Sequence, residues 1–145
     1  MIAAIPVLVQ GVVMTVDEFY CHRRREMRRW ERVGHPLDTL TYLICFLFLL
    51  FVDPSSVTLT GYAALAIFSC LFITKDEWQH RELCTPFENW LHSLLFILHP
   101  VVLIAAGWMW WSRADDLRIV VGAMAVATAL FGVFQVVYWN LLAKN

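Results

Sequence analysis

The sequence predicts an all-α fold, a polytopic membrane bundle of five transmembrane helices. The chain has 145 residues, of which 60% are hydrophobic and 16% charged, whereas a typical soluble domain is near half apolar and about a quarter charged. Its apolar residues gather in runs close to the roughly 20 residues that a helix needs to cross the hydrocarbon core. We therefore expect a single integral-membrane domain over residues 1–145, with apolar runs at about 2–20, 37–52, 57–74, 89–111 and 117–142.

The basic residues predict the orientation of this bundle. Five crossings place three basic segments on one side of the membrane and leave Arg113 and Arg118 on the other. Basic loops remain in the cytoplasm, so we expect a multi-pass protein of the inner membrane, with its N-terminus outside and its C-terminus cytoplasmic. The residues on the richer side are Arg23, Arg24, Arg25, Arg28, Arg29, Arg32, Lys75, Arg81 and Lys144.

Turn and cap residues predict where the helices begin and end. The first helix is expected to continue through the arginine segment to Gly34, a C-cap residue, so that Pro36 lies in the first turn of the second helix. The segment 53–56 (Asp-Pro-Ser-Ser) predicts a tight turn before the third helix. We expect that helix to end near Leu83 and the fourth to begin after a Thr85 cap.

Four of the five histidines are expected at one membrane face, each with a carboxylate three or four residues away. Residues at these spacings lie on one helical face. Ferritin-like bundles bind two metal ions through carboxylates of four helices and two Glu-x-x-His pairs. Four of the helices are therefore predicted to surround a site for two divalent ions, iron first, with manganese or zinc as alternatives. The predicted ligands are Glu18, His22, His35, Asp38, Glu77, His80, Glu88 and His92.

Two resemblances accompany this pattern. The strings DEFYCHRRR and GHPLDTLTY resemble motifs of a group of small bacterial integral-membrane proteins, which implies a membrane protein but no particular activity. The ligand pattern of the first four helices resembles that of the di-iron carboxylate proteins. It departs from that family in its reversed His35-x-x-Asp38 pair and its Glu-x-x-x-His pairs, so the identity and number of the metal ions stay open.

Three further residues have two or more readings each. His99 follows His92 by seven residues, which places it roughly 10 Å deeper on the same helical face. It is either a relay group for the site or a hydrogen-bonding residue inside the bundle. Tyr42 either faces the site or packs in the interior with its hydroxyl satisfied. Asp17 is an interfacial charge, a partner of the arginines or a further member of the site.

The leading functional hypothesis is redox or oxygen chemistry by a di-iron protein near the cytoplasmic interface, acting on a hydrophobic small molecule. One alternative is a di-zinc hydrolase with a lipid-like substrate, and another is a metal sensor or transporter. Few polar residues, chiefly Thr41, His99 and Gln135, are expected in the outer halves of the helices, which disfavours transport. A membrane scaffold without a metal is the remaining alternative.

The expected partners are membrane lipids, and the arginine cluster is either a topology determinant or a site for anionic headgroups. Nucleic acid is not expected, because the basic run lies at a membrane face. The last helix has no ionisable group between Arg118 and Lys144, so we assign it to packing or to contact between copies of the chain. Its small residues would permit close helix approach, namely Gly122, Ala125, Ala129 and Gly132.

Overall fold

The computed structural model describes residues 4–24 and 27–143, apart from the side chains of Ala4, Arg24, Asp76, Gln79, Arg81 and Glu82. Arg24, Arg25, Arg81 and Lys144, which contribute to the predicted charge asymmetry, therefore lie outside the described residues or side chains. The elements are α1 (Ala4–Val16), the π-helical turn η1 (Asp17–Cys21), the 3₁₀ turn η2 (His22–Arg24), α2 (Arg29–Phe51), α3 (Ser56–Phe72), the 3₁₀ turn η3 (Ile73–Asp76), α4 (Glu77–Leu83), α5 (Pro86–Trp111), α6 (Leu117–Val137) and the π-helical turn η4 (Tyr138–Leu142).

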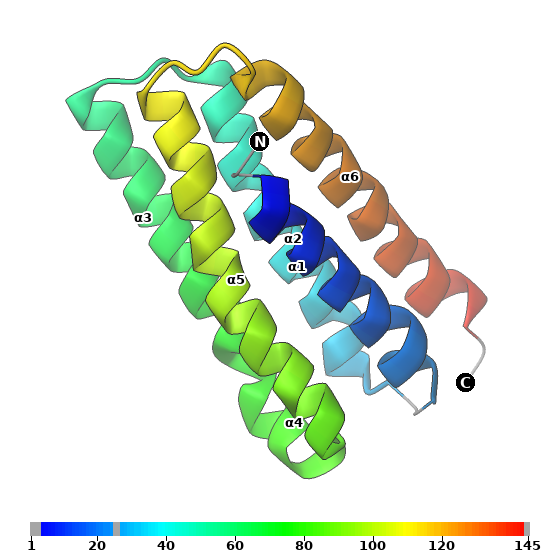
Figure 1. The fold of residues 1–145 in the computed structure, drawn as a ribbon. Coiled ribbons are helices and arrows are strands. Elements are labelled where there is room, and N and C mark those ends of the chain that lie inside the picture. The colour runs from blue at the N-terminus through cyan, green and yellow to red at the C-terminus, as the bar shows by residue number, and fades with distance from the viewer. Residues whose placement is uncertain (1–3, 25–26, 144–145) are drawn as a thin grey trace.

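These helices form one bundle, and the predicted all-α class is confirmed. Figure 1 shows the α2–α3 and α5–α6 connections at one end of the bundle and α4 at the opposite end. Helix α1 lies in front of α2 in this view, between α5 and α6. Helix α1 therefore lies in the middle of the bundle, and its C-terminal end places η1 at the same end of the bundle as α4.

Four helical segments are long and apolar enough to cross a membrane: Arg29–Phe51, Ser56–Lys75, Pro86–Trp111 and Leu117–Leu142. Large apolar side chains face outward along them, as at Ile104 and Ile119, which are 71% and 76% exposed. Such exposure is expected where the surroundings are hydrocarbon. The regular part of α1 has 13 residues, fewer than the roughly 20 that span a bilayer core. The side of the membrane on which each terminus lies stays a prediction.

The predicted boundary between the first two helices was wrong. The chain leaves α1 through η1 and η2, and α2 begins at Arg29, so Pro36 lies inside α2 rather than in its first turn. The side chain of Glu31 caps this start by accepting a hydrogen bond from the Arg28 backbone N–H at 2.9 Å. Proline deprives the carbonyl four residues earlier of its helical donor. The Asn140 side chain donates to that carbonyl, the one of Arg32, at 3.3 Å.

The other predicted boundaries agree more closely with the structure. Ser55 caps α3 by accepting a hydrogen bond from the Thr58 N–H, and Thr85 caps α5 by accepting one from the Glu88 N–H. The helix that was expected to continue to Leu83 does end there, but η3 divides it into α3 and α4. This division turns α4 across the end of the bundle, as Figure 1 shows.

The apolar core fills the half of the bundle away from α4. Trp110 and Phe46 are each 1% exposed in this core. The Trp110 indole N–H donates to the Val52 carbonyl at 2.6 Å, and the Tyr62 hydroxyl donates to the Leu103 carbonyl at 2.7 Å. Both aromatic residues thus satisfy their polar atoms while they bury their rings. A smaller apolar cluster around Val13, Cys21 and Leu91 joins α1 and η1 to α5, beside the polar side chains that gather toward the α4 end.

We predict that Gly107→Ala destabilises the fold. A Cβ at this position would lie 2.6 Å from Cε1 of Tyr62, whose ring is buried and fixed by its hydrogen bond to Leu103. The expected loss is about 1–3 kcal/mol of unfolding free energy, typical of overpacking. Tryptophan fluorescence during thermal unfolding in detergent measures it. Gly122→Ala is the matched control, because a Cβ there meets nothing within 4 Å; equal midpoints for the two variants would contradict the prediction.

Candidate metal centre

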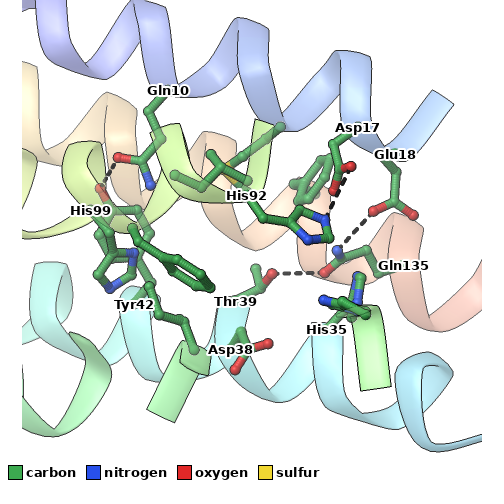
Figure 2. Close-up of a pocket in the computed structure, with 16 residues that line it drawn as sticks. Gln10, Asp17, Glu18, His35, Asp38, Thr39, Tyr42, His92, His99 and Gln135 are labelled. Atoms are coloured by element: carbon green, nitrogen blue, oxygen red, sulfur yellow. Dashed lines mark hydrogen bonds and ion pairs between the residues drawn. The ribbon is translucent and has the colours of Figure 1, made fainter. Parts of the chain in front are cut away.

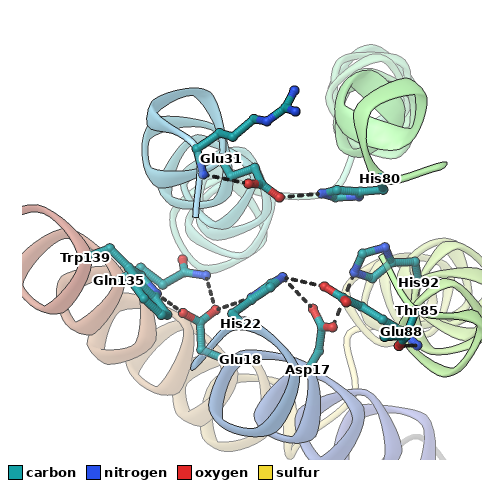
Figure 3. A network of polar contacts seen from close by, with 11 residues as sticks. Asp17, Glu18, His22, Glu31, His80, Thr85, Glu88, His92, Gln135 and Trp139 are labelled. Atoms are coloured by element: carbon teal, nitrogen blue, oxygen red, sulfur yellow. Dashed lines mark hydrogen bonds and ion pairs between the residues drawn. The ribbon is translucent and has the colours of Figure 1, made fainter. Parts of the chain in front are cut away.

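A cluster of carboxylates and imidazoles lies at the α4 end of the bundle (Figure 3). Its members come from η1, η2, α2, α4 and α5, and their donor atoms form groups compact enough to hold a metal ion. Seven of the eight side chains belong to fully buried residues, and that of His35 is partly exposed. The eight are Asp17, Glu18, His22, Glu31, His35, His80, Glu88 and His92.

The four imidazoles form the centre of this cluster. Ring centroids of consecutive members are 4.7 Å apart for His22 and His35, 6.0 Å for His35 and His80, 4.4 Å for His80 and His92, and 6.3 Å for His92 and His22. The four rings therefore close a loop. Carboxylates surround it, which distributes negative charge around potential metal sites.

The first group within the cluster joins η1 and η2 to α5. The Nε2 atom of His22 is 3.7 Å from Oδ2 of Asp17 and 3.5 Å from Oε1 of Glu88. The Nε2 atom of His92 is 3.3 Å from Oδ1 of Asp17. One ligand atom from each of these four residues lies within 4.8 Å of all the others. Two carboxylates and two imidazoles thus converge on one small volume.

The second group joins α2 to α4. His80 Nε2 lies 3.3 Å from Oε1 of Glu31, and His35 completes a group of three within the same 4.8 Å limit. The two groups are connected through Glu18, whose Oε2 is 3.9 Å from Nδ1 of His22 and which groups with His22 and His35. A further group consists of His80, Cys84 and His92, so the cluster contains several overlapping groups of donors that could hold metal ions.

The separations themselves fit metal coordination better than direct hydrogen bonding. Hydrogen bonds between nitrogen and oxygen are about 2.7–3.2 Å long, shorter than the 3.3–3.9 Å contacts of the cluster. Two ligands, each about 2.1 Å from a tetrahedral ion, are about 3.4 Å apart. Among the described residues, Nδ1 of His92 and Nε2 of His80 are buried without a hydrogen-bond partner. The donor set therefore fits a resident ion.

The π-helical turn η1 explains how three neighbouring residues reach the same interior. The His22 N–H closes this turn on the Asp17 carbonyl, five residues back, which is the wider spacing of a π-helix. Asp17 and Glu18 are 6% and 3% exposed although they are adjacent in the chain, and His22 is 0% exposed. Such turns recur at functional sites.

Helix α6 and the π-helical turn η4 hold Glu18 in place from the opposite side, through Gln135 of α6 and Trp139 of η4. Oε1 of Glu18 accepts a hydrogen bond from the Trp139 indole, and Oε2 accepts one of 3.1 Å from the Gln135 amide. The side-chain carbonyl of Gln135 in turn accepts a hydrogen bond of 2.7 Å from the Thr39 hydroxyl. The expectation that the last helix only packs was therefore incomplete, and Gln135 lies beside the cluster rather than in the outer half. The expected contact between copies of the chain stays a prediction.

Six of the eight predicted ligands belong to the cluster, whereas Asp38 and Glu77 belong to none of its groups. Both carboxylate oxygens of Asp38 accept hydrogen bonds from Nζ of Lys75, at 2.6 and 2.7 Å. Glu77 is half-buried, and its Oε2 has no hydrogen-bond partner among the described residues. The structure thus places Asp38 in an ion pair between α2 and η3.

Two cluster residues, Asp17 and Glu31, were not among the predicted ligands. Glu31 was missed because the expected boundary at Gly34 placed it on the first helix, away from His35. With both residues on α2, Glu31-x-x-x-His35 repeats the spacing of Glu18 with His22 and of Glu88 with His92. This threefold repeat was the sequence feature that could have identified Glu31. For Asp17, only the π turn shows that it points inward.

Asp17 lies in η1, outside the four candidate spans. Burial alone raises the pKa of its carboxyl, but the hydrogen bond with His92 and the electrostatic attraction of His22, His92 and His80 outweigh burial and lower that pKa below its ordinary value. The carboxyl is therefore ionised at neutral pH, the form in which a carboxylate binds a metal ion.

A cavity of about 110 Å³ extends from the cluster toward the middle of the bundle (Figure 2). Glu18 and His35 lie at one end and the stacked rings of Tyr42 and His99, 4.2 Å apart, at the other, with His92 between them. His99 Nε2 is hydrogen-bonded to the Ser69 hydroxyl at 2.9 Å, and the Tyr42 hydroxyl donates to Oε1 of Gln10 at 2.9 Å. Both rings thus satisfy their polar atoms inside the bundle, as one reading predicted, while they also line the cavity.

Comparison of the chain with protein-family models, with curated proteins and with solved structures found no match. The fold and site together define a helical bundle with four apolar spans and buried groups of histidine and carboxylate that could hold metal ions.

We predict that Lys75→Met destabilises the protein by about 1 kcal/mol, because it removes the ammonium group that donates to both oxygens of the largely buried Asp38 carboxylate. The double variant Asp38→Asn/Lys75→Met should recover most of that loss, since no uncompensated charge remains. Thermal midpoints in detergent compare the three proteins. A double variant as unstable as the single one would show that the ion pair is not the source of the effect.

Proposed function

We propose that this protein is a membrane-embedded dimetal protein, and that its particular form is a di-iron centre with redox or oxygen chemistry. The proposal is supported by one observation above all. Four imidazoles and four carboxylates are brought together from five elements, at contacts of 3.3–3.9 Å, close to the separation of ligands around an ion.

The ligand set follows from the two groups. Asp17, His22, Glu88 and His92 would hold the first ion. Glu31, His35 and His80 would hold the second, and Glu18 lies between the two groups. Mixed oxygen and nitrogen donors suit iron, manganese or zinc. Iron is proposed first because open positions in sites of histidine and carboxylate are typical of iron that reacts with oxygen.

The cavity residues would perform the remaining tasks. Its apolar wall includes Met14, Leu95 and Phe96, which would exclude bulk water and accept an apolar substrate. Trp139 and Gln135 hold the Glu18 carboxylate in one orientation, as partners of a metal ligand do. Bound iron would supply electron transfer or oxygen activation, and zinc would instead supply an activated water for hydrolysis.

The same packing speaks against a metal transporter. An ion path must be polar on both sides of the central site. Beyond Tyr42 the bundle interior is filled by the apolar core, which contains Phe46, Leu49, Val102 and Leu103. These residues are at most 2% exposed, so the far half of the bundle is sealed along its axis.

We predict about two metal ions per chain in protein purified without chelators, as in dimetal bundles. Asp17→Asn and Glu31→Gln, which preserve side-chain shape, should each weaken binding by at least about tenfold. Asp38→Asn is the matched control and should retain both ions, since Asp38 belongs to no group of the cluster. Elemental mass spectrometry with a chelator titration measures both quantities.

The outcome of this series also decides between ligand sets. Loss of metal in Asp38→Asn but not in Glu31→Gln would contradict the proposed set and favour the one predicted from the sequence. Absorption bands of iron in the loaded protein support redox chemistry. Two tightly bound zinc ions, with hydrolysis of a lipid ester in detergent and no iron bands, would assign the site to hydrolysis instead.

A further inference from the structure

A second, larger hollow opens on the side of the bundle, between α1 and α6. Its volume is about 500 Å³, and its lining comes from α1, α2 and α6. We refer to it as the lateral groove. It is lined by Val7, Leu8, Gln10, Gly11, Val12, Met14, Thr15, Val16, Tyr42, Phe46, Met124 and Ala127.

The lateral groove has an exposed apolar rim and a buried floor. Leu8 and Val12 on the rim are 67% and 64% exposed, whereas Phe46 and Met124 on the floor are 1% and 7% exposed. The groove is level with residues 42 and 46 of α2, in the middle of an apolar span. In a membrane the medium against this rim is therefore hydrocarbon, and an aqueous solute would not reach it.

The lateral groove adjoins the cavity beside the metal cluster. Gln10, Met14 and Tyr42 line both hollows, so these three side chains form the boundary between them. Gln10 precedes Asp17 by seven residues, and Tyr42 follows His35 by the same number. Two helical turns, or about 10 Å of helical rise, thus separate this boundary from the cluster.

Polar chemistry at the boundary suits an oxygen-bearing group. The Gln10 side chain is 4% exposed, and within the described part of the chain its one recorded partner is Tyr42, which donates to Oε1. The amide Nε2 of Gln10 retains two donors and lies between the two hollows. A carbonyl or hydroxyl oxygen that arrives from the lateral groove can accept a hydrogen bond from this amide, and the hydrogen bond from Tyr42 to Oε1 is kept.

We propose that the lateral groove is the entrance through which a membrane-dissolved lipid, one apolar chain with an oxygen-bearing head, reaches the metal cluster. The apolar chain of the lipid lies in the groove between α1 and α6, and its head passes Gln10 into the 110 Å³ cavity. That cavity is smaller than the 150 Å³ hollow that holds one benzene, so it takes only the head of such a lipid. The inference rests on the proposed function, because the metal cluster is where the lipid head would arrive. It deepens that function by naming the substrate class.

Gly11 provides a test that leaves the cluster untouched. A Cβ at Gly11 meets nothing within 4 Å, although Gly11 lines the groove. Gly11→Leu therefore places its Cβ without a clash and adds a bulky apolar side chain to the groove lining, and leucine favours a helix more than glycine does. Gly122→Leu is the matched control, because its Cβ also meets nothing within 4 Å and Gly122 is not part of the lining.

The experiment uses the full chain in phosphatidylcholine vesicles with a long-chain fatty alcohol that carries a diazirine in its chain. After illumination, mass spectrometry should find the label concentrated on peptides of Met14 and Met124. Gly11→Leu should lower that labelling at least several-fold, and Gly122→Leu should leave it unchanged. In Gln10→Leu, the preference for the alcohol over a diazirine alkane of the same length should disappear.

Three results would overturn the proposal. They are labelling spread evenly over outward residues such as Ile104, labelling unaffected by Gly11→Leu, or a dimer that Gly11→Leu disrupts while the groove stays unlabelled. The last would assign the groove to a second copy of the chain. Labelling is measured with and without a chelator, and metal content is measured in every variant. Groove labelling in a protein that binds no metal would therefore reject the dimetal function while it supports the entrance.

Discussion

The structure depends on the mutual burial of acidic and basic side chains at one end of an apolar bundle. An isolated ionised carboxylate or imidazolium at membrane depth is costly, and a buried ion pair that loses one partner is strongly destabilised. Asp17, Glu18, Glu31 and Glu88 are each at most 6% exposed. Each of them contacts an imidazole, so no carboxylate of the cluster is buried alone. The bundle can close only if these groups face one another.

Several local features serve this constraint. The π turn η1 directs two adjacent carboxylates inward, and the early start of α2 brings Glu31 onto the same face as His35. That start leaves Pro36 inside a helix, and Asn140 offsets the lost hydrogen bond by donating to the Arg32 carbonyl. The segment of α6 and η4 therefore supports the cluster twice, through Asn140 of η4 and through Gln135 and Trp139, the partners of Glu18. Its contribution is polar, although its composition is almost entirely apolar.

The two halves of the bundle differ in what they admit. The half away from α4 is packed with large apolar and aromatic side chains and is sealed along its axis. The half near α4 contains the cluster and the cavity beside it, and the lateral groove lies nearer the middle of the bundle, where Gln10, Met14 and Tyr42 line both hollows. Such an arrangement suits chemistry on a molecule already dissolved in the membrane better than passage of an ion across it. It also explains why polar residues are sparse in the far half.

The sequence by itself determined the helical class, the apolar spans and the meeting of histidines with carboxylates at one end, because helical periodicity and apolar run length are local properties. It also located the caps Ser55 and Thr85. Only the tertiary structure decided which carboxylates face the histidines. Asp38 lies beside Lys75 of η3, and Glu31 takes the place beside His35 because α2 begins before the proline. Asn140, 108 residues away from Arg32 in the chain, donates to the carbonyl that Pro36 leaves without its helical donor, and a contact so distant in sequence cannot be read from local spacing.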